Sequence, residues 1–344
     1  MSLIRRLTRV PAIGLALAAT CAALPAHAAD TTLLNVSYDV TRELYKDINP
    51  AFIAAYKKQS GETVNLRQSH GGSSAQALAV TQGLQADVVT MNQSTDIDLL
   101  HTRGDLVRAD WRAQFPNHSA PYTTTMVFLV RKGNPKHIKD WNDLTRPDVA
   151  VILPNPKTAG NGRYSYLAAW GWRLRQGGSD AQARDFVTKI LHNVPVLDTG
   201  GRGATTTFTQ RNIGDVLITF ENEVALIRQE MPTQGFEAVY PSASILAEPP
   251  VAVVDKVVDK RGTRKEATAY LNFLYSPEGQ EIIAQHHLRP RDPAVLQRHA
   301  ADFAPMKFFT VEELFGGWDN AQKTHFADGG TFDQVILKAK AGAN

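Results

Sequence analysis

Cysteine is almost absent from this sequence of 344 residues, which contains only Cys21. That residue lies in an N-terminal segment with three arginines, an apolar run over residues 12–24 and the small-x-small triplet Ala26-His27-Ala28. This order is typical of a secretory signal peptide over residues 1–28, and it predicts export to the periplasm without a lipid anchor. The exported chain then contains no cysteine, so a sizeable hydrophobic core must hold the fold without disulfides.

An excess of charge of either sign is missing as well. The chain has 37 Lys and Arg against 34 Asp and Glu, and the predicted leader removes three Arg and no acid, which leaves 34 of each. A neutral chain argues against nucleic acid as a partner, because nucleic acid requires a basic face. Any anion site must therefore act through local groups rather than through overall charge. No apolar run after residue 28 is long enough to cross a membrane.

The motifs of common hydrolases are also missing. The sequence has no Gly-x-Ser-x-Gly elbow and no His-Glu-x-x-His. The best pairing of a nucleophile with a base is Ser73 with His70, and the pair His286-His287 has no third metal ligand nearby in the sequence. We therefore predict a binding protein and not an enzyme, with no metal and no cofactor, and keep a secreted hydrolase as the less favoured alternative.

Glycine and serine are gathered in four loops, each of which follows a short apolar run and precedes a segment of helical character. A turn from strand to helix exposes backbone N–H groups at the positive end of the helix, and these groups can bind an oxyanion. Four such loops without a nucleotide-binding motif indicate convergence on one small anion. The loops lie at residues 36–41, 69–74, 154–162 and 199–208.

The order of the apolar runs predicts an α/β fold. Short apolar runs alternate with helical segments, which is typical of parallel strands with helices on both faces of the sheet, and ligands bind at the carboxyl ends of such strands. The pattern occurs twice, in the first and in the middle part of the chain. The expected strands cover residues 33–37, 63–67, 86–91, 149–153, 194–197 and 214–220.

Two further apolar segments, residues 123–131 and 247–254, are interpreted as connections between two halves of the molecule. Two connections of this kind form a hinge with a cleft beside it. We therefore predict two lobes. One comprises residues 29–120 together with 248–344, and the other comprises residues 121–247.

At these loops the sequence resembles the periplasmic sulfate- and thiosulfate-binding proteins of sulfur ABC importers. The resemblance covers nearly all of the chain after the leader. The motifs that carry it are Asn35–Asp39, Gln68–Ser73, Leu129–Pro135, Asp140–Leu144, Tyr275–Gln280, Phe315–Trp318 and Thr324–Gly330. The resemblance implies a bilobal periplasmic-binding-protein fold of type II, with two mixed sheets, flanking helices and two hinge crossings. It also implies a monomer that closes on a desolvated dianion and docks on an inner-membrane permease.

The resemblance also implies the ligand contacts. The N–H of Asp39 and the Ser73 group belong to the first lobe, with the Asp39 carboxylate free to cap its own helix. The second lobe supplies the loop of Ala159, Gly160 and Asn161, the N–H of Gly201, and Phe220. Two positions depart from the sulfate branch, since Ala159 replaces a serine hydroxyl and Phe220 replaces a tryptophan indole. Residues 87–93, 199–208 and 214–221 are closer to the thiosulfate branch.

Two questions stay open at this point. Arg202 either forms an ion pair with the anion or is a structural residue tied to Glu221 or Glu223, and the second reading is favoured because the family binds its ligand through neutral donors. The same fold with phosphate, molybdate or ferric iron is the alternative for the ligand. Phosphate would require a carboxylate acceptor, and iron would require clustered tyrosines and carboxylates, which these loops lack.

Overall fold

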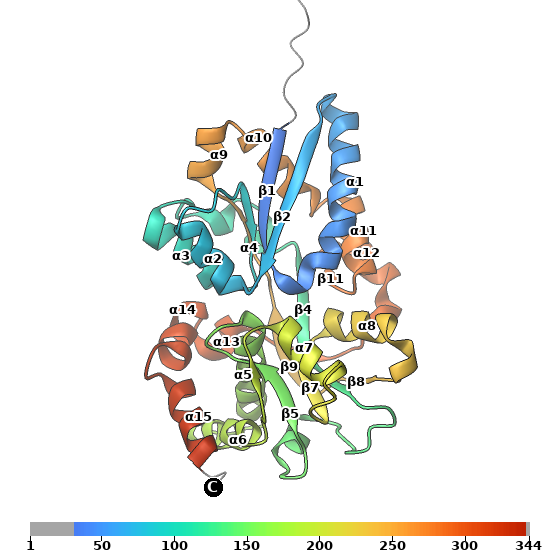
Figure 1. Ribbon diagram of the computed structural model, residues 1–344, viewed down its shortest axis with the longest axis vertical. Helices are drawn as coiled ribbons and strands as arrows, with labels where there is room; N and C mark the ends of the chain where they lie inside the picture. Colours follow the sequence, from blue (N-terminus) through green and yellow to red (C-terminus); the bar gives the residue numbers. More distant parts are fainter. Residues whose placement is uncertain (1–30, 342–344) are drawn as a thin grey trace, which may run out of the picture.

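The computed structural model describes residues 31–341, and the predicted signal peptide lies outside the described residues. Two sheets organise the chain (Figure 1). The smaller sheet has the strand order β10 (Val251–Val253), β3 (Val88–Thr90), β1 (Thr31–Tyr38) and β2 (Val64–Gly71). The larger sheet has the order β12 (Lys307–Phe309), β9 (Ala243–Ala247), β4 (Tyr122–Val130), β7 (Val216–Phe220), β5 (Val151–Pro154) and β6 (Leu197–Asp198), and β8 (Glu237–Val239) and β11 (Arg289–Pro290) also pair with β4.

We call the smaller sheet with its helices the first lobe. Its helices are η1 (Asp39–Thr41), α1 (Arg42–Ser60), α2 (Ser73–Thr81), α3 (Ser94–Gly104), η2 (Trp111–Ala113), α4 (Pro116–Ser119), α9 (Asp255–Arg261), α10 (Arg264–Phe273), α11 (Pro277–Gln285), α12 (Pro293–Arg298) and η5 (Ala300–Asp302). Strand β1 is parallel to β2 and β3, and β10 runs antiparallel to β3. Because side chains alternate along a strand, Leu33 packs with α1, α10 and α11 while Val36 packs with α2 and α3.

The larger sheet with its helices is the second lobe. Its helices are η3 (Trp141–Thr145), α5 (Gly160–Arg175), α6 (Asp180–His192), α7 (Gly201–Thr209), α8 (Glu221–Glu230), η4 (Pro232–Gln234), α13 (Val311–Phe315), α14 (Trp318–Ala321), the π-helical turn η6 (Gln322–Phe326) and α15 (Thr331–Ala341). All nine residues of β4 are buried. Phe128 faces the cluster that contains α5 and α6, and Val127 and Leu129 face α7 and α8. The sheet is therefore covered on both faces, which explains why its strands appear in the sequence as unbroken apolar runs.

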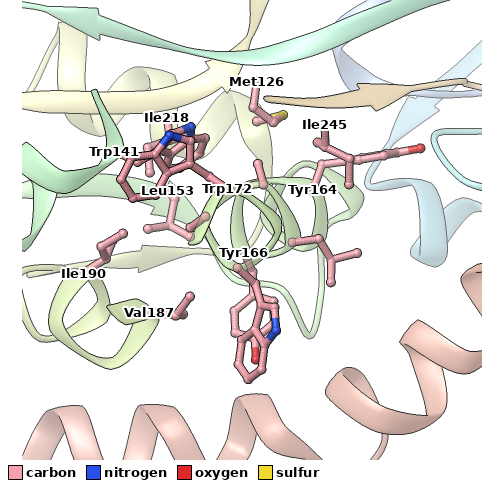
Figure 2. Close-up of a cluster of buried hydrophobic side chains, with 14 of the residues drawn as sticks. Met126, Trp141, Leu153, Tyr164, Tyr166, Trp172, Val187, Ile190, Ile218 and Ile245 are labelled. Carbon is pink, nitrogen blue, oxygen red and sulfur yellow. The ribbon is translucent and has the colours of Figure 1, made fainter. Parts of the chain in front are cut away.

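Helix α5 lies at the centre of the second lobe. Thirteen of its residues, from Gly160 to Trp172, are buried, and a helix that is apolar on every side belongs in a protein interior. Figure 2 shows Tyr164, Tyr166 and Trp172 projecting from α5 in different directions into the surrounding cluster. The predicted role of these aromatic side chains in core packing is confirmed, and the rigid core fixes the position of the N-terminus of α5.

The chain passes between the lobes at both predicted places, and the described residues contain a third passage. Residues 120–121 lead into β4, and residues 248–250 join β9 of one sheet to β10 of the other. Arg291 ties these two connections together, because its Nε donates to the carbonyl of Ala120 (3.2 Å) and its Nη2 to Glu248 (2.5 Å). The third passage lies between α12 and β12, where the chain returns to the second lobe.

This third passage corrects the predicted assignment of the C-terminal segment, residues 248–344, to the first lobe. Strand β12 pairs in parallel with β9, and α15 packs along α6 (Figure 1). Residues 307–341 therefore lie with the second lobe. The apolar side chains of this segment, among them Phe309 and Trp318, belong to the same buried cluster as α5. The close packing at Gly171 shows how tight this contact is, since a Cβ there would overlap the ring of Phe309.

The position of β12 leads to a prediction for stability. Phe309 is 1% exposed in the core of the second lobe, and its replacement by Ala should lower the free energy of unfolding by about 3–5 kcal/mol. Lys307→Ala, an exposed change on the same strand, is the control and should alter it by no more than about 0.5 kcal/mol. Urea unfolding of both variants measures the difference. Equal stability of the two variants would show that β12 does not anchor the segment.

Candidate functional site

The four predicted loops come together between the lobes around a small cavity. Seven of the eight predicted site residues line it, and Arg202 does not. Three helices, α2, α5 and α7, begin at this cavity, with Ser73, Gly160 and Gly201 as their first residues. The full lining is Tyr38, Asp39, Val40, Gly72, Ser73, Asn92, Ala159, Gly160, Asn161, Gly200, Gly201 and Phe220.

In the first lobe, the hydroxyl of Ser73 is already engaged by the protein. Its Oγ donates to Asp96 (2.5 Å) and accepts the backbone N–H of Asn92 (2.9 Å). The donor that Ser73 can offer to a ligand is therefore its backbone N–H, which as the first N–H of α2 has no partner within that helix. Burial raises the pKa of the Asp96 carboxyl, and the charge of Arg163 acts in the opposite direction.

The hydrogen bond from Ser73 to Asp96 also argues against the secreted hydrolase, for which Ser73 and His70 are the best pairing of a nucleophile with a base. A nucleophilic serine needs a base that accepts its proton, and Ser73 gives its hydrogen bond to Asp96 and not to His70. His70 is partly buried, and this burial lowers its pKa.

The carboxylate of Asp39 lies between two helix starts. The backbone N–H groups of Val40, in its own first turn, and of Arg202, at the start of α7 in the opposite lobe, lie close enough to lower the pKa of this carboxyl group. Its Oδ2 lies 3.5 Å from the place of a Cβ on Gly200. Burial raises the pKa of Asp39, and the two interactions with Arg202 oppose that rise. Asp39 therefore links the lobes at the edge of the cavity.

The guanidinium of Arg202 stays behind the cavity wall. Its charge acts on Asp39 and on Glu223, and it lowers the pKa of both carboxyls against the effect of burial. Glu221, the other candidate partner, is engaged by Arg289 through two hydrogen bonds of 2.7 and 2.8 Å. Nη2 of Arg202 is buried without a hydrogen-bond partner among the described residues, so the preference for a structural Arg202 stays a prediction.

In the second lobe, the loop before α5 presents backbone rather than side-chain donors. The N–H of Ala159 donates to the carbonyl of Asn155 (3.0 Å), so Ala159 offers only its methyl group. The side chain of Asn161 donates to Thr219 (3.1 Å), so Asn161 offers its backbone N–H. Gly160 and Asn161 are the first two residues of α5, and their N–H groups lack intrahelical acceptors.

Phe220 closes one side of the cavity with an apolar ring. It is the last residue of β7, it is fully buried, and its ring packs edge-to-face on Tyr164 at 5.8 Å. With the methyl of Ala159, it forms a wall that offers no hydrogen-bond donor from a side chain.

Sequence reasoning did not name every residue of the cavity. Asn92 is the most consequential omission, because its side chain is polar and only 3% exposed. It follows directly on the expected strand 86–91, and therefore lies at the edge where the other loops meet. The rule that ligands bind at the carboxyl ends of strands would have found it. Tyr38, Val40, Gly72 and Gly200, which also line the cavity, are immediate neighbours of predicted residues.

No lysine or arginine lines the cavity, so its positive character comes from the ends of α2, α5 and α7. The described part of the chain contains no group of three side chains that suits a metal ion. Among its helices, none combines the length and the apolar character needed to span a bilayer.

Comparison with known proteins agrees with this geometry. Residues 34–289 match the family model described as bacterial extracellular solute-binding protein. The chain belongs to this family. It is 58% identical to the thiosulfate-binding protein of Pseudomonas aeruginosa over 310 residues, covering 90% of this chain and 93% of that one. It is 55% identical to the sulfate-binding protein of Escherichia coli over 323 residues, covering 94% and 98%.

Among solved structures of this fold, the sulfate-binding protein SubI from Mycobacterium tuberculosis matches with a TM-score of 0.77 and 33% identity, covering 85% of this chain and 98% of that one. The resemblance noted in the sequence and the bilobal α/β fold that it implies are thereby confirmed.

The buried carboxyl group next to the cavity makes folding depend on pH. Burial raises the pKa of Glu223 from 4.5 to about 7, so the folded chain binds a proton more tightly than the unfolded one, and stability falls as pH rises from about 4.5 to about 7. Glu223→Gln removes this penalty. The variant should gain stability over the parent above pH 7, at most about 3 kcal/mol, and the gain should vanish toward pH 4.5.

Thermal unfolding of parent and variant at a series of pH values measures this difference, and Glu230→Gln on the same helix, whose side chain is exposed, serves as the control. A gain for Glu223→Gln that is the same at pH 5 and pH 8 would contradict the raised pKa.

Proposed function

We propose that this protein is a periplasmic receptor that captures sulfate or thiosulfate between its lobes and delivers the ion to an ABC importer. The observation that carries the proposal is the convergence of three helix N-termini on a cavity between the lobes that no lysine or arginine lines. The names of relatives that align over nearly the whole chain support the class of ligand.

The chemistry of the cavity suits a fully deprotonated dianion. Sulfate and thiosulfate carry no proton at neutral pH and only accept hydrogen bonds, so backbone N–H groups from both lobes are suitable partners. Removing such an ion from water is costly, and every oxygen must therefore find donors. Hydrogen bonds to a charged group contribute about 1.5–3 kcal/mol each. Several of them, with the helix ends, leave about 8 kcal/mol after the costs of ordering, which is a micromolar site.

The wall of Phe220 and Ala159 favours thiosulfate over sulfate. A terminal sulfur is larger than oxygen and a poorer acceptor, so an apolar wall suits it better than an indole or a hydroxyl does. Sulfate in the same place would leave one or two of its oxygens without a donor, and its binding would lose the free energy of the missing hydrogen bonds.

The remaining parts of the proposal concern the route of the ion. Residues 1–28 direct export and are then removed. The protein acts as a monomer, closes by a hinge at the passages between the lobes, and presents the closed form to an inner-membrane permease. It catalyses no reaction on the ion.

Calorimetric titration of the exported chain, freed of ligand by unfolding and refolding, tests the ligand. We expect sulfate or thiosulfate to bind in the micromolar range, with thiosulfate the tighter, and phosphate and molybdate to give no heat at the same concentrations. Binding of phosphate in place of both sulfur oxyanions would overturn the proposal.

The role of the apolar wall has its own prediction. Phe220→Trp with Ala159→Ser introduces an indole N–H and a hydroxyl into the cavity wall, and the ratio of sulfate to thiosulfate affinity should rise by about 10-fold or more, since each new hydrogen bond to the ion is worth about a factor of ten. Competition calorimetry gives the ratio. Since both wall residues are buried, Ala159→Val, which adds bulk without a donor, is the control, and an unchanged ratio in the double variant would refute the role of the wall.

A further inference from the structure

We propose that Asn92 is a ligand-binding residue of the first lobe and that its Nδ2 donates a hydrogen bond to the bound anion. The inference rests on the proposed function and adds a side-chain donor to a site otherwise built from backbone N–H groups. Asn92 lies two residues beyond the end of β3, lines the cavity and is 3% exposed.

The surroundings of Asn92 fix its orientation. Its backbone N–H donates to Ser73 Oγ (2.9 Å), which holds the residue against the start of α2. Its Oδ1 is buried, accepts no hydrogen bond from the described residues, and lies against the α carbon of Gly160, where a Cβ would overlap it. With the oxygen end of the amide turned to α5, the nitrogen end is left for the cavity.

The position of Nδ2 is what suits a ligand. The unpaired Oδ1 is an acceptor that an anion cannot satisfy, so the inference rests on the nitrogen end of the amide, on a residue that lines the cavity. An anion in the cavity favours this orientation, because Nδ2 donates to it whereas Oδ1 would repel it. The extra donor makes up for one of the two that Ala159 and Phe220 do not supply.

Gly160 makes this arrangement possible. Any side chain at this position would displace the amide of Asn92, since an added Cβ overlaps Oδ1 and lies 3.1 Å from the Cβ of Asn92. The bare backbone at the start of α5 therefore lets a side chain of the first lobe reach the same anion as the N–H groups of the second lobe.

Two variants separate ligand binding from a merely structural role. Asn92→Leu keeps the volume of the side chain and removes the donor, and Asn92→Asp keeps the shape and places a negative charge at the ion. Affinity for the ion that the parent binds more tightly should fall about 10- to 100-fold in Asn92→Leu and further in Asn92→Asp. The Tm of both variants without ligand should stay close to that of the parent.

Asn193→Leu is the matched control, because the amide of Asn193 donates to the carbonyls of Leu144 (2.9 Å) and Arg146 (2.7 Å) away from the cavity. It should lower the Tm and leave the affinity unchanged. Calorimetry with sulfate and thiosulfate gives all dissociation constants.

An affinity of Asn92→Leu within about threefold of that of the parent would overturn the assignment. Equal affinities of Asn92→Leu and Asn92→Asp would overturn it as well, because a carboxylate that faces the dianion must weaken binding more than an apolar group does. Failure of the unaltered protein to bind either ion would be a different result, which refutes the proposed function itself.

Discussion

The cost of removing a small dianion from water governs the design of this protein. A site that meets this cost with neutral donors needs many N–H groups around one point, and a single helix start supplies only a few of them. Two sheets must therefore direct α2, α5 and α7 to the same cavity and approach closely enough to exclude water. Gly160 allows that approach, since its bare α carbon lies against Asn92 of the opposite lobe. Gly72 does the same beside the carbonyl of Thr158.

Full charges stand one layer behind the donors. Asp96 accepts from Ser73, and Arg163 of the second lobe acts on that carboxylate and reaches Ser74 with a hydrogen bond of 3.4 Å. Arg202 has the equivalent place behind α7, between Asp39 and Glu223. These groups place charges of both signs beside the loops, and Asp39 itself lines the cavity. Selectivity is then set by which atoms line the wall and not by attraction between whole charges.

Sequence patterns predicted the loops and the alternation of strands and helices, because glycine loops after apolar strands are local signals. The family resemblance supplied the individual site residues, of which seven line the cavity. The patterns did not predict the place of the C-terminal segment. The apolar residues Phe309 and Trp318 show no periodicity that would indicate which element they pack against. In addition, the pairing of β12 with β9 joins residues that lie more than sixty positions apart in the sequence. Asn92 was missed although it lies directly after an expected strand, because the loops were selected by their glycine and serine residues and not by their position at a strand end.

The passages between the lobes also explain why closure needs the ion. Arg291 binds both Ala120 and Glu248, so the two predicted connections move as one unit, and the third passage limits how far β12 can separate from α12. Opening thus keeps the contacts at the hinge and must break those across the cavity. Those contacts include the carboxyl group of Asp39 beside the start of α7 and the apolar packing of Tyr38 and Val40 against the second lobe. The hydrogen bonds to a dianion held by both lobes supply the difference that favours the closed form.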